Sequence, residues 1–122
     1  MKTTGVIGLG DMGSGLAKNL LKSGFKVNGL DLNAERLKAF TEMGGNPASS
    51  LVDVARHSDA VFVMVMSGDQ AKSVILGDDG LGAHLEEGSA ILLSATIKPH
   101  EARAIGAALD GSGIHLIDTP VS

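Results

Sequence analysis

Three glycines near the start of the chain, Gly8, Gly10 and Gly13, have a spacing that suits the binding of a phosphate group. They lie between an apolar segment and an amphipathic segment, where a strand would turn into a helix. In such a turn the first glycine permits the tight bend, the second lets the backbone approach a pyrophosphate, and the third lets the helix pack closely on the strand. The helix N-terminus then offers unpaired N–H groups and a partial positive charge to an anion. The expected phosphate-binding turn comprises Gly8, Leu9, Gly10, Asp11, Met12 and Gly13.

An acidic residue follows at the distance that such a turn requires. Asp31 comes 21 residues after Gly10, at the end of the next apolar segment. A carboxylate at this place can accept hydrogen bonds from the ribose hydroxyls of a dinucleotide, and it would repel the 2′-phosphate of NADP. The next residue, Leu32, is aliphatic, and Arg36 is the nearest cation. The pattern therefore predicts NAD as the cofactor, with Asp31 and Leu32 among the residues that bind it.

Short apolar runs alternate with amphipathic stretches along the whole chain, which is typical of βαβ units around a parallel sheet. Strands are expected at about residues 4–9, 26–31, 46–48, 60–66, 90–94 and 114–118. Helices are expected at about residues 11–23, 33–43, 50–57, 69–76 and 99–109, with a glycine-rich bend before residue 85. We therefore predict a doubly wound Rossmann α/β fold: a mainly parallel six-stranded sheet with helices on both faces.

Local signals set the ends of several of these elements. Gly24 is expected to end the first helix, Asn33 to cap the second, and Ser50 with Asp53 to form a capping box. In the second helix Phe40 and Met43 are expected to point inward.

Composition and charge exclude several classes of protein. With 122 residues the chain is expected to form one domain, residues 1–122. The net charge is −4 and charges of both signs are interspersed, so neither nucleic acid nor an anionic membrane is expected as a partner. The absence of cysteine excludes disulfides and a thiolate nucleophile. No targeting or membrane-spanning segment is visible, and a cytoplasmic location is expected.

The remaining polar residues offer no metal site. The histidines are His57, His84, His100 and His115, and none is paired at metal-ligand spacing with another histidine or a carboxylate. We interpret them as solvent-facing or capping residues. Asp118 ends a strand, where it could act in catalysis or hold the following turn.

Two segments at opposite ends of the chain resemble a known family. Val6–Gly13 (VIGLGDMG) with Ala17–Leu20 (AKNL) is similar to the opening stretch of the β-hydroxyacid dehydrogenases. That family includes 3-hydroxyisobutyrate and tartronate semialdehyde dehydrogenases and is related to 6-phosphogluconate dehydrogenase. Asp118–Ser122 (DTPVS) resembles the start of the family's substrate-binding segment. The resemblance spans the whole chain.

The resemblance implies an oxidoreductase that transfers a hydride between a hydroxy acid and NAD. It implies that Val65, Met66 and Thr96 line the nicotinamide side and that Ser122 touches the substrate carboxylate. The family's catalytic lysine lies in a helical C-terminal domain that this chain lacks. We therefore expect no catalytic residue in this chain, no turnover by the chain alone, and a homo-oligomer for the intact enzyme.

At two positions the sequence departs from the residues that are usual in the family, and both departures point to one branch of it. Val65-Met66 stands where the family often has Leu-Pro or Val-Pro, and residues 93–96 (LSAT) stand where it often has Asp-x-Ser-Thr. Both are similar to the branch that acts on sugar acids such as threonate. Two other functions stay open: a regulatory nucleotide-binding module, and a methyltransferase that uses S-adenosylmethionine. The loop at residues 119–122 disfavours the module, and the pyrophosphate-shaped turn disfavours the methyltransferase.

Overall fold

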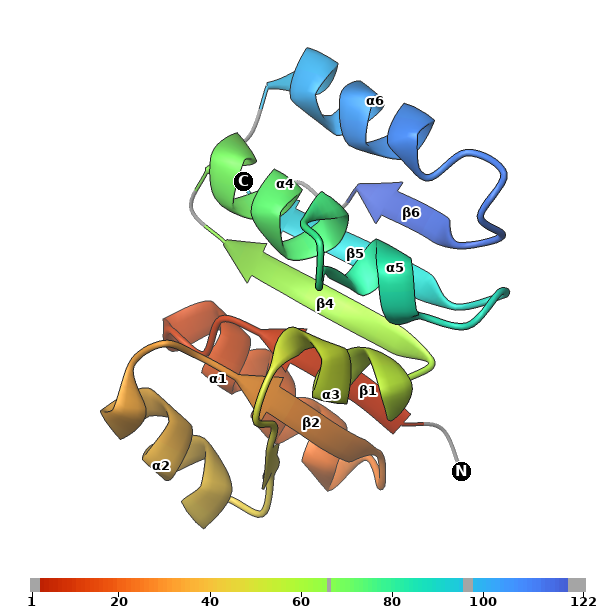
Figure 1. Cartoon of the computed structure of the whole chain (residues 1–122). Helices are drawn as coiled ribbons and strands as arrows, with labels where there is room; N and C mark the ends of the chain where they lie inside the picture. Colours follow the sequence, from red (N-terminus) through yellow and green to blue (C-terminus); the bar gives the residue numbers. More distant parts are fainter. Residues whose placement is uncertain (1–2, 66, 96–97, 119–122) are drawn as a thin grey trace.

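The computed structural model describes residues 3–65, 67–95 and 98–118, which form a six-stranded sheet with helices on both faces (Figure 1). The strands are β1 (Thr3–Ile7), β2 (Lys26–Leu30), β3 (Asn46–Pro47), β4 (Ala60–Val65), β5 (Ala90–Ala95) and β6 (His115–Asp118). The helices of the described residues are α1 (Asp11–Lys22), α2 (Ala34–Glu42), α3 (Leu51–Arg56), α4 (Gly68–Leu76), α5 (Leu81–His84) and α6 (Pro99–Ala108).

Neighbouring strands are parallel throughout, and their order across the sheet is β3-β2-β1-β4-β5-β6. The chain therefore runs outward from β1 to β3, crosses back to the other side of β1, and runs outward again from β4 to β6. This order confirms the doubly wound Rossmann fold predicted from the sequence. The connection that follows β1 and the one that follows β4 leave toward opposite sides of the sheet. A crevice therefore opens beyond the carboxyl ends of these two strands, and doubly wound sheets bind their ligands in such a crevice.

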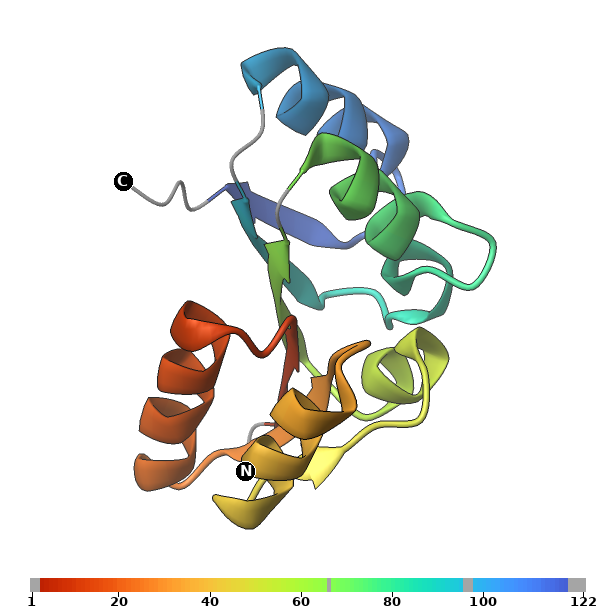
Figure 2. The same cartoon turned by 90° about the vertical axis from the view of Figure 1, so that its left-hand side faces the viewer.

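Each face of the sheet has its own core. On one face α1 and α2 pack over β1 and β2, around Val6, Val27 and the fully buried Phe40. On the opposite face α3, α4, α5 and α6 pack against a larger core that includes Val61 and Val63 of β4. Figure 2 shows the two groups of helices on either side of the sheet. Residues of β4 therefore alternate between two cores, which explains its continuous apolar sequence.

Local signals in the sequence set the ends of several helices. Gly24, just after α1, has a φ of 91°, which glycine adopts without steric cost. The side chain of Asn33 caps α2 by accepting hydrogen bonds from two first-turn N–H groups, and Ser50 accepts one from Asp53 at the start of α3. The ends at Gly24 and Asn33 agree with the expectations from the sequence. Of the expected capping box only the Ser50 half is present, because the Asp53 carboxylate accepts from the N–H of Ser49, one residue before the N-cap.

Two expectations about elements were wrong. The segment expected to be only a glycine-rich bend contains α5, whose first residue, Leu81, is fully buried. A helix of four residues is too short to show a helical period in the sequence, so only its packing reveals it. Met43, expected to point inward, is 36% exposed because it lies at the C-cap, past the last turn of α2.

Candidate functional site

The glycine turn after β1 has two positions where a side chain has no room. Gly8 has a φ of 93°, and its N–H donates to the carbonyl of Leu30 at 2.9 Å. A Cβ atom at Gly8 would overlap the carbonyl oxygen of Met64, and one at Gly13 would overlap the carbonyl oxygen of Gly8. These two glycines therefore let α1 start directly against β1 and β4.

Gly10 differs, because it faces open space. The nearest atoms to a Cβ built there belong to the Arg36 guanidinium, at 3.8 and 3.9 Å. Gly10 is the N-cap of α1 and has no side chain to accept a hydrogen bond from the first turn. Asp11 and Met12, the next two residues, are exposed. The N-terminus of α1 is therefore accessible to a ligand.

Asp31 is held against this turn. Its Oδ2 accepts a hydrogen bond from the N–H of Leu9 at 2.7 Å, and its Oδ1 accepts one from the N–H of Asn33 at 2.7 Å. Its side chain is 9% exposed, whereas that of Arg36 is 56% exposed with Nη1 4.0 Å from Oδ2. The carboxylate is therefore fixed by backbone groups, beside a cation that is free to move.

The helices that begin directly after a strand differ in how their N-termini are closed. In α2, α3 and α4 the side chains of Asn33, Ser50 and Ser67 accept hydrogen bonds from the first turn. In α6 the first residue is Pro99, which has no N–H, and Glu101 accepts from the N–H of Lys98. Within the described part of the chain, α1 is thus the helix following a strand that has no side chain over its N-terminus. An anion at this edge of the sheet would find its donors there.

A groove of about 360 Å³ continues from the turn across the carboxyl ends of β1, β2 and β4. Asp31 and Arg36 are its charged lining residues, and Leu32, which is fully exposed, lies at its margin. The far wall is formed by Val65 at the end of β4 and by α4. One charged end and an apolar wall suit a ligand with polar and aromatic parts.

Of the sequence-predicted residues, Gly8, Asp31, Leu32 and Val65 line this groove. The glycine turn, Asp31, Leu32 and Val65 all lie at the carboxyl edge of β1, β2 and β4. Leu9 is 1% exposed and packs in the core, and its backbone N–H and carbonyl are hydrogen-bonded to Asp31 and Ser14, so its part in the site is to hold the turn. The predictions for Met66, Thr96 and Ser122 fall outside the described residues.

Sequence reasoning missed part of the apolar lining. Leu51, Met64 and Val74 all line the groove. The alternation in β4 predicts Met64 to be a core residue; it does pack against the core under α1, and it also reaches the groove. No local signal marks these residues, because an apolar side chain that lines a groove has the same pattern as one in a core.

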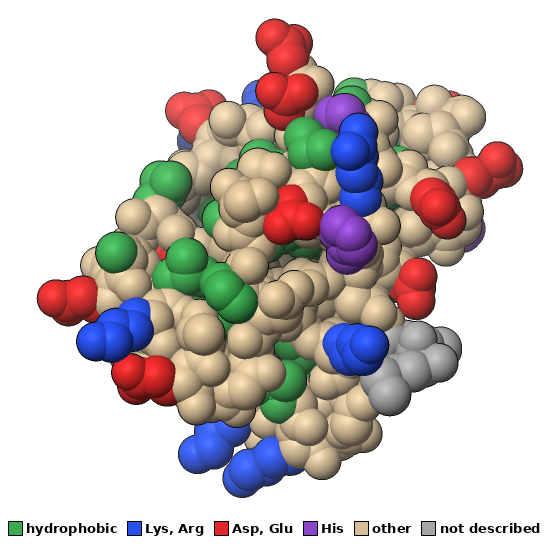
Figure 3. All heavy atoms as spheres, turned by 60° about the horizontal axis from the view of Figure 1, so that its bottom comes forward, with side chains coloured by type: hydrophobic (Ala, Val, Ile, Leu, Met, Phe, Trp, Pro, Cys, Tyr) green, Lys and Arg blue, Asp and Glu red, His purple; other side chains and the backbone are tan. Residues whose placement is uncertain are grey.

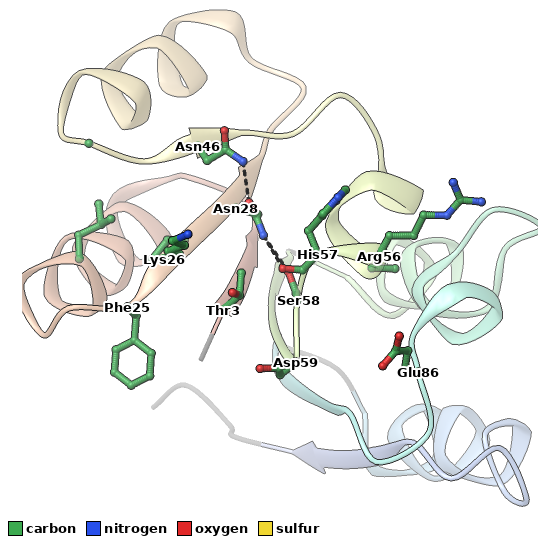
Figure 4. A pocket seen from close by; sticks show the side chains of 14 residues that line it. Thr3, Phe25, Lys26, Asn28, Asn46, Arg56, His57, Ser58, Asp59 and Glu86 are labelled. Atoms are coloured by element: carbon green, nitrogen blue, oxygen red, sulfur yellow. Dashed lines mark hydrogen bonds between the residues drawn. The ribbon is translucent and has the colours of Figure 1, made fainter. Parts of the chain in front are cut away.

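A second hollow, of about 710 Å³, lies at the opposite edge of the sheet, between the starts of β2 and β4 (Figure 4). At its centre Asn28 donates to the carbonyl of His57 at 2.9 Å and to Ser58 Oγ at 3.3 Å, and it accepts from Asn46 Nδ2 at 2.7 Å. These polar groups satisfy one another, so we interpret this hollow as a structural junction. Figure 3 shows a face of the molecule on which cationic and anionic side chains are interspersed.

The histidines of the described residues form no metal site, and no group of three metal-ligating side chains occurs among those residues. The expectation that no histidine is paired with a carboxylate was wrong for His57, whose Nδ1 lies 3.0 Å from Asp53 Oδ1, because residues four apart lie on the same face of a helix. The pKa of Asp53 is lowered mainly by the hydrogen bond from the Ser49 N–H and further by His57. The expectation of solvent-facing histidines was wrong for His84: its Nε2 is buried, makes no hydrogen bond in the described structure, and lies 3.7 Å from Oδ1 of Asp79.

Comparisons with known proteins agree with this geometry. The model of the family described as the NAD-binding domain of 6-phosphogluconate dehydrogenase matches residues 3–122. An L-threonate dehydrogenase of Cupriavidus necator is 38% identical over 99% of this chain and 41% of its own length. An NAD-dependent L-serine dehydrogenase of Pseudomonas aeruginosa is 38% identical over 100% of this chain and 41% of its own length.

Solved structures agree as well. A crystal structure titled 3-hydroxyisobutyrate dehydrogenase, from Salmonella typhimurium, superposes with a TM-score of 0.93 at 32% identity, over 100% of this chain and 42% of that one. The chain thus spans about two fifths of the length of these proteins. Of the described residues, no helix is long and apolar enough to cross a membrane.

Proposed function

The chain belongs to the family of the NAD-binding domain of 6-phosphogluconate dehydrogenase, and from this premise we propose that it binds the cofactor of an enzyme that transfers a hydride between a hydroxy acid and a nicotinamide. Because the chain covers 41% of the threonate and serine dehydrogenases, the remaining parts of the enzyme are proposed to lie in a second, helical domain. The cytoplasmic location and the homo-oligomer stay predictions.

The observation that supports cofactor binding most strongly is the open N-terminus of α1 beside a fixed carboxylate. The space at Gly10 would let a pyrophosphate reach the first-turn N–H groups, because the nearest side chain is the largely exposed Arg36. Asp31 directs its carboxylate to the same turn through the Leu9 N–H, so each oxygen keeps a lone pair for a ribose hydroxyl. The residues present therefore fit a dinucleotide.

We propose NAD rather than NADP. The proposal rests on the charge of Asp31, which lies where the 2′-phosphate of NADP would approach. The name of the serine dehydrogenase, which specifies NAD, is in line with it. Arg36 is the cation that could weaken this preference, since its guanidinium is 4.0 Å from the carboxylate and largely exposed.

The chemistry divides between this chain and the rest of the enzyme. When bound, the nicotinamide accepts or donates the hydride. This chain binds the pyrophosphate at α1, orients the adenosine ribose at Asp31, and covers the cofactor with the apolar wall of the groove. None of the described residues that line the groove is a lysine. We propose that a lysine of the second domain is the general acid and base.

The substrate is proposed to be a small hydroxy acid. Sugar acids such as threonate are favoured by the two departures at residues 65–66 and 93–96, and the relatives include an L-threonate dehydrogenase. We propose that Ser122 contacts the substrate carboxylate and that Val65, Met66 and Thr96 line the nicotinamide side.

The test is a titration of the chain with NADH, followed by the fluorescence of the reduced nicotinamide. The chain has no Trp and no Tyr, so no intrinsic emission from these residues overlaps the signal. We expect saturable binding that ADP-ribose displaces and S-adenosylmethionine does not. With threonate, serine or 3-hydroxyisobutyrate and NAD, we expect no NADH production by the chain alone.

Two results would contradict the proposal. Failure to bind NADH or ADP-ribose would mean that the glycine turn is only structural. Turnover of a hydroxy acid by the purified chain would mean that a catalytic group lies within residues 1–122.

A further inference from the structure

Two uncharged polar side chains, those of Gln70 and Ser73, line the groove from α4. With Val74 they have the i, i+3 and i+4 spacing that places residues on one face of a helix. Gln70 and Ser73 are exposed, whereas Val74 is half-buried against the core. Among the described residues that line the groove, the other polar side chains are the charged Asp31 and Arg36. The wall that α4 gives to the groove is therefore apolar where it is half-buried and polar where it is exposed.

The position of Asp31 predicts which part of a dinucleotide would face this wall. β2 and β4 pair with opposite sides of β1, so Asp31, after β2, and α4, after β4, are separated by two strand spacings, about 10 Å. A purine nucleoside whose ribose lies at Asp31 is long enough to cross that distance. The ribose is attached to the five-membered ring of the purine, so the six-membered ring extends away from it. The far edge of the base would therefore lie at α4.

The size and the lining of the groove also suit a single base. Its volume of about 360 Å³ is close to the lower limit for a small-molecule site, so it matches a nucleoside better than a whole dinucleotide. Leu51 and Val74, both half-buried, offer apolar surface to the faces of a purine ring. The edge of that ring carries hydrogen-bond donors and acceptors, and Gln70 and Ser73 have the groups to pair with them.

The side chain of Gln70 can distinguish adenine from other purines. A glutamine amide has one acceptor oxygen and two N–H donors, so it can accept from the 6-amino group of adenine while it donates to N7. Hypoxanthine and guanine have a carbonyl oxygen at position 6, where the acceptor of the amide would meet another acceptor. The Ser73 hydroxyl, one turn further along α4, both donates and accepts. It can therefore bind either kind of base.

We propose that Gln70 and Ser73 bind the far edge of the adenine base, and that Gln70 makes the domain select adenine over purines with a carbonyl group at position 6. The proposal rests on the proposed function, because it takes the groove as the place of the adenosine. Asp31 would bind the ribose, and α4 would read the base. A dinucleotide with another purine should therefore bind more weakly, although its riboses, pyrophosphate and nicotinamide are unchanged.

The experiment compares NADH with reduced nicotinamide hypoxanthine dinucleotide. The two differ only in the base, where a carbonyl group replaces the 6-amino group and N1 carries a hydrogen. The fluorescence of the reduced nicotinamide reports both titrations. For the wild type we expect the Kd of the hypoxanthine dinucleotide to be about tenfold higher than that of NADH, as for one bidentate contact to a base.

Two variants test the two side chains separately. Gln70→Leu keeps the approximate size of the side chain and removes its hydrogen bonds, so it should raise the Kd of NADH about tenfold and reduce the preference for adenine to less than about twofold. Ser73→Ala should raise the Kd of both dinucleotides about threefold and leave their ratio unchanged, because a hydroxyl can pair with either base.

Lys72→Met is the matched control. Lys72 is exposed on the same helix and is not among the described residues that line the groove. The change also replaces a long polar side chain by an apolar one, and it should leave the ratio of the two Kd values as in the wild type. Equal Kd values for the wild type, a preference that Gln70→Leu retains, or unchanged affinities in Ser73→Ala would overturn the proposal. Failure of the wild type to bind NADH would instead contradict the proposed function.

Discussion

Gly10 and Gly13 are three residues apart, yet a side chain would meet very different surroundings at the two positions. At Gly13 a Cβ would overlap the backbone oxygen of Gly8, whereas at Gly10 only the end of the Arg36 side chain lies nearby. Backbone atoms do not move aside for a substitution, and the end of a long exposed side chain does. Gly13 is therefore required for the packing of the helix, whereas Gly10 keeps the surface open to a ligand.

We predict that Gly10→Val abolishes most NADH binding while the domain stays folded. The branched side chain would fill the space that the pyrophosphate needs, and we expect at least about a tenfold rise in Kd. Fluorescence titration measures the affinity, and far-UV circular dichroism with thermal melting reports the fold.

Gly13→Ala is the contrasting variant. Its methyl group has no room, so we expect a loss of about 1–3 kcal/mol in the free energy of unfolding, as for an overpacked core. If Gly10→Val unfolded the domain and Gly13→Ala did not, the roles given to the two glycines would be reversed.

The preference between cofactors is a property of Asp31. Two like charges about 4 Å apart repel by roughly 4 kcal/mol at an effective dielectric of 20. With half of that removed by screening, we predict a preference for NADH over NADPH of about thirtyfold in affinity. Asp31→Ser should reduce the difference between the dissociation constants of NADH and NADPH, mainly through tighter NADPH binding. Titration with each cofactor measures the two constants.

Arg36→Ala is a useful companion, because it removes the cation whose Nη1 is 4.0 Å from Asp31 Oδ2. We expect this variant to increase the difference in affinity between NADH and NADPH. Equal affinities of the wild type for NADH and NADPH would show that Asp31 does not face the 2′ position.

Among the elements, the junction around Asn28 holds together three parts of the chain that are distant in sequence. Its side chain links β2 to β3 through Asn46, and to the connection between α3 and β4 through the His57 carbonyl and Ser58. Asn28 is 5% exposed, so water cannot readily replace these partners. The junction compensates for the shortness of β3, which has two residues and forms one edge of the sheet.

We predict that Asn28→Ala lowers the free energy of unfolding by about 1–3 kcal/mol, because it leaves buried polar groups without partners. Urea denaturation measures the change. NADH affinity at a temperature where the variant is folded should match the wild type, since the junction lies at the edge of the sheet opposite to the groove. A loss of affinity would indicate that the second hollow takes part in binding.

At the scale of the whole molecule, one face of the sheet is covered over only part of its width. α1 and α2 cover β1 and β2, and Phe62 and Met64 of β4 pack against the same core, whereas β5 and β6 carry no helix on that face among the described residues (Figure 2). The register places Phe62, Leu92 and Ile117 in a row across β4, β5 and β6. Ile117, at the open edge, is 46% exposed. Phe62 and Leu92 are half-buried, so the row is apolar surface that is partly open to solvent.

We predict that the chain by itself associates through this row of Phe62, Leu92 and Ile117. Multi-angle light scattering over a range of concentrations should show a mass that rises above the monomer. Ile117→Lys should restore the monomer, because a charge at the exposed end of the row cannot be buried without a partner. A wild-type chain that stays monomeric at high concentration would contradict the prediction.

The sequence by itself determined the elements other than α5, their order and the turn that starts α1. Those features depend on interactions within a few residues, such as the Asn33 cap, the Ser50 cap and the positive φ of Gly24, or on the period of apolar residues. The fold class then followed, because alternating strands and helices have few ways to pack.

Only the tertiary structure decided how the site is assembled. The hydrogen bond from Leu9 to Asp31 joins residues 22 apart, and the contact of Glu101 with Gly68 joins two separate crossovers. The apolar wall at Met64 and Val74 likewise exists because α4 packs beside the end of β4. Such contacts depend on how whole elements pack against one another. Neither the period of apolar residues nor a local spacing in the sequence predicts which residues of different elements will touch.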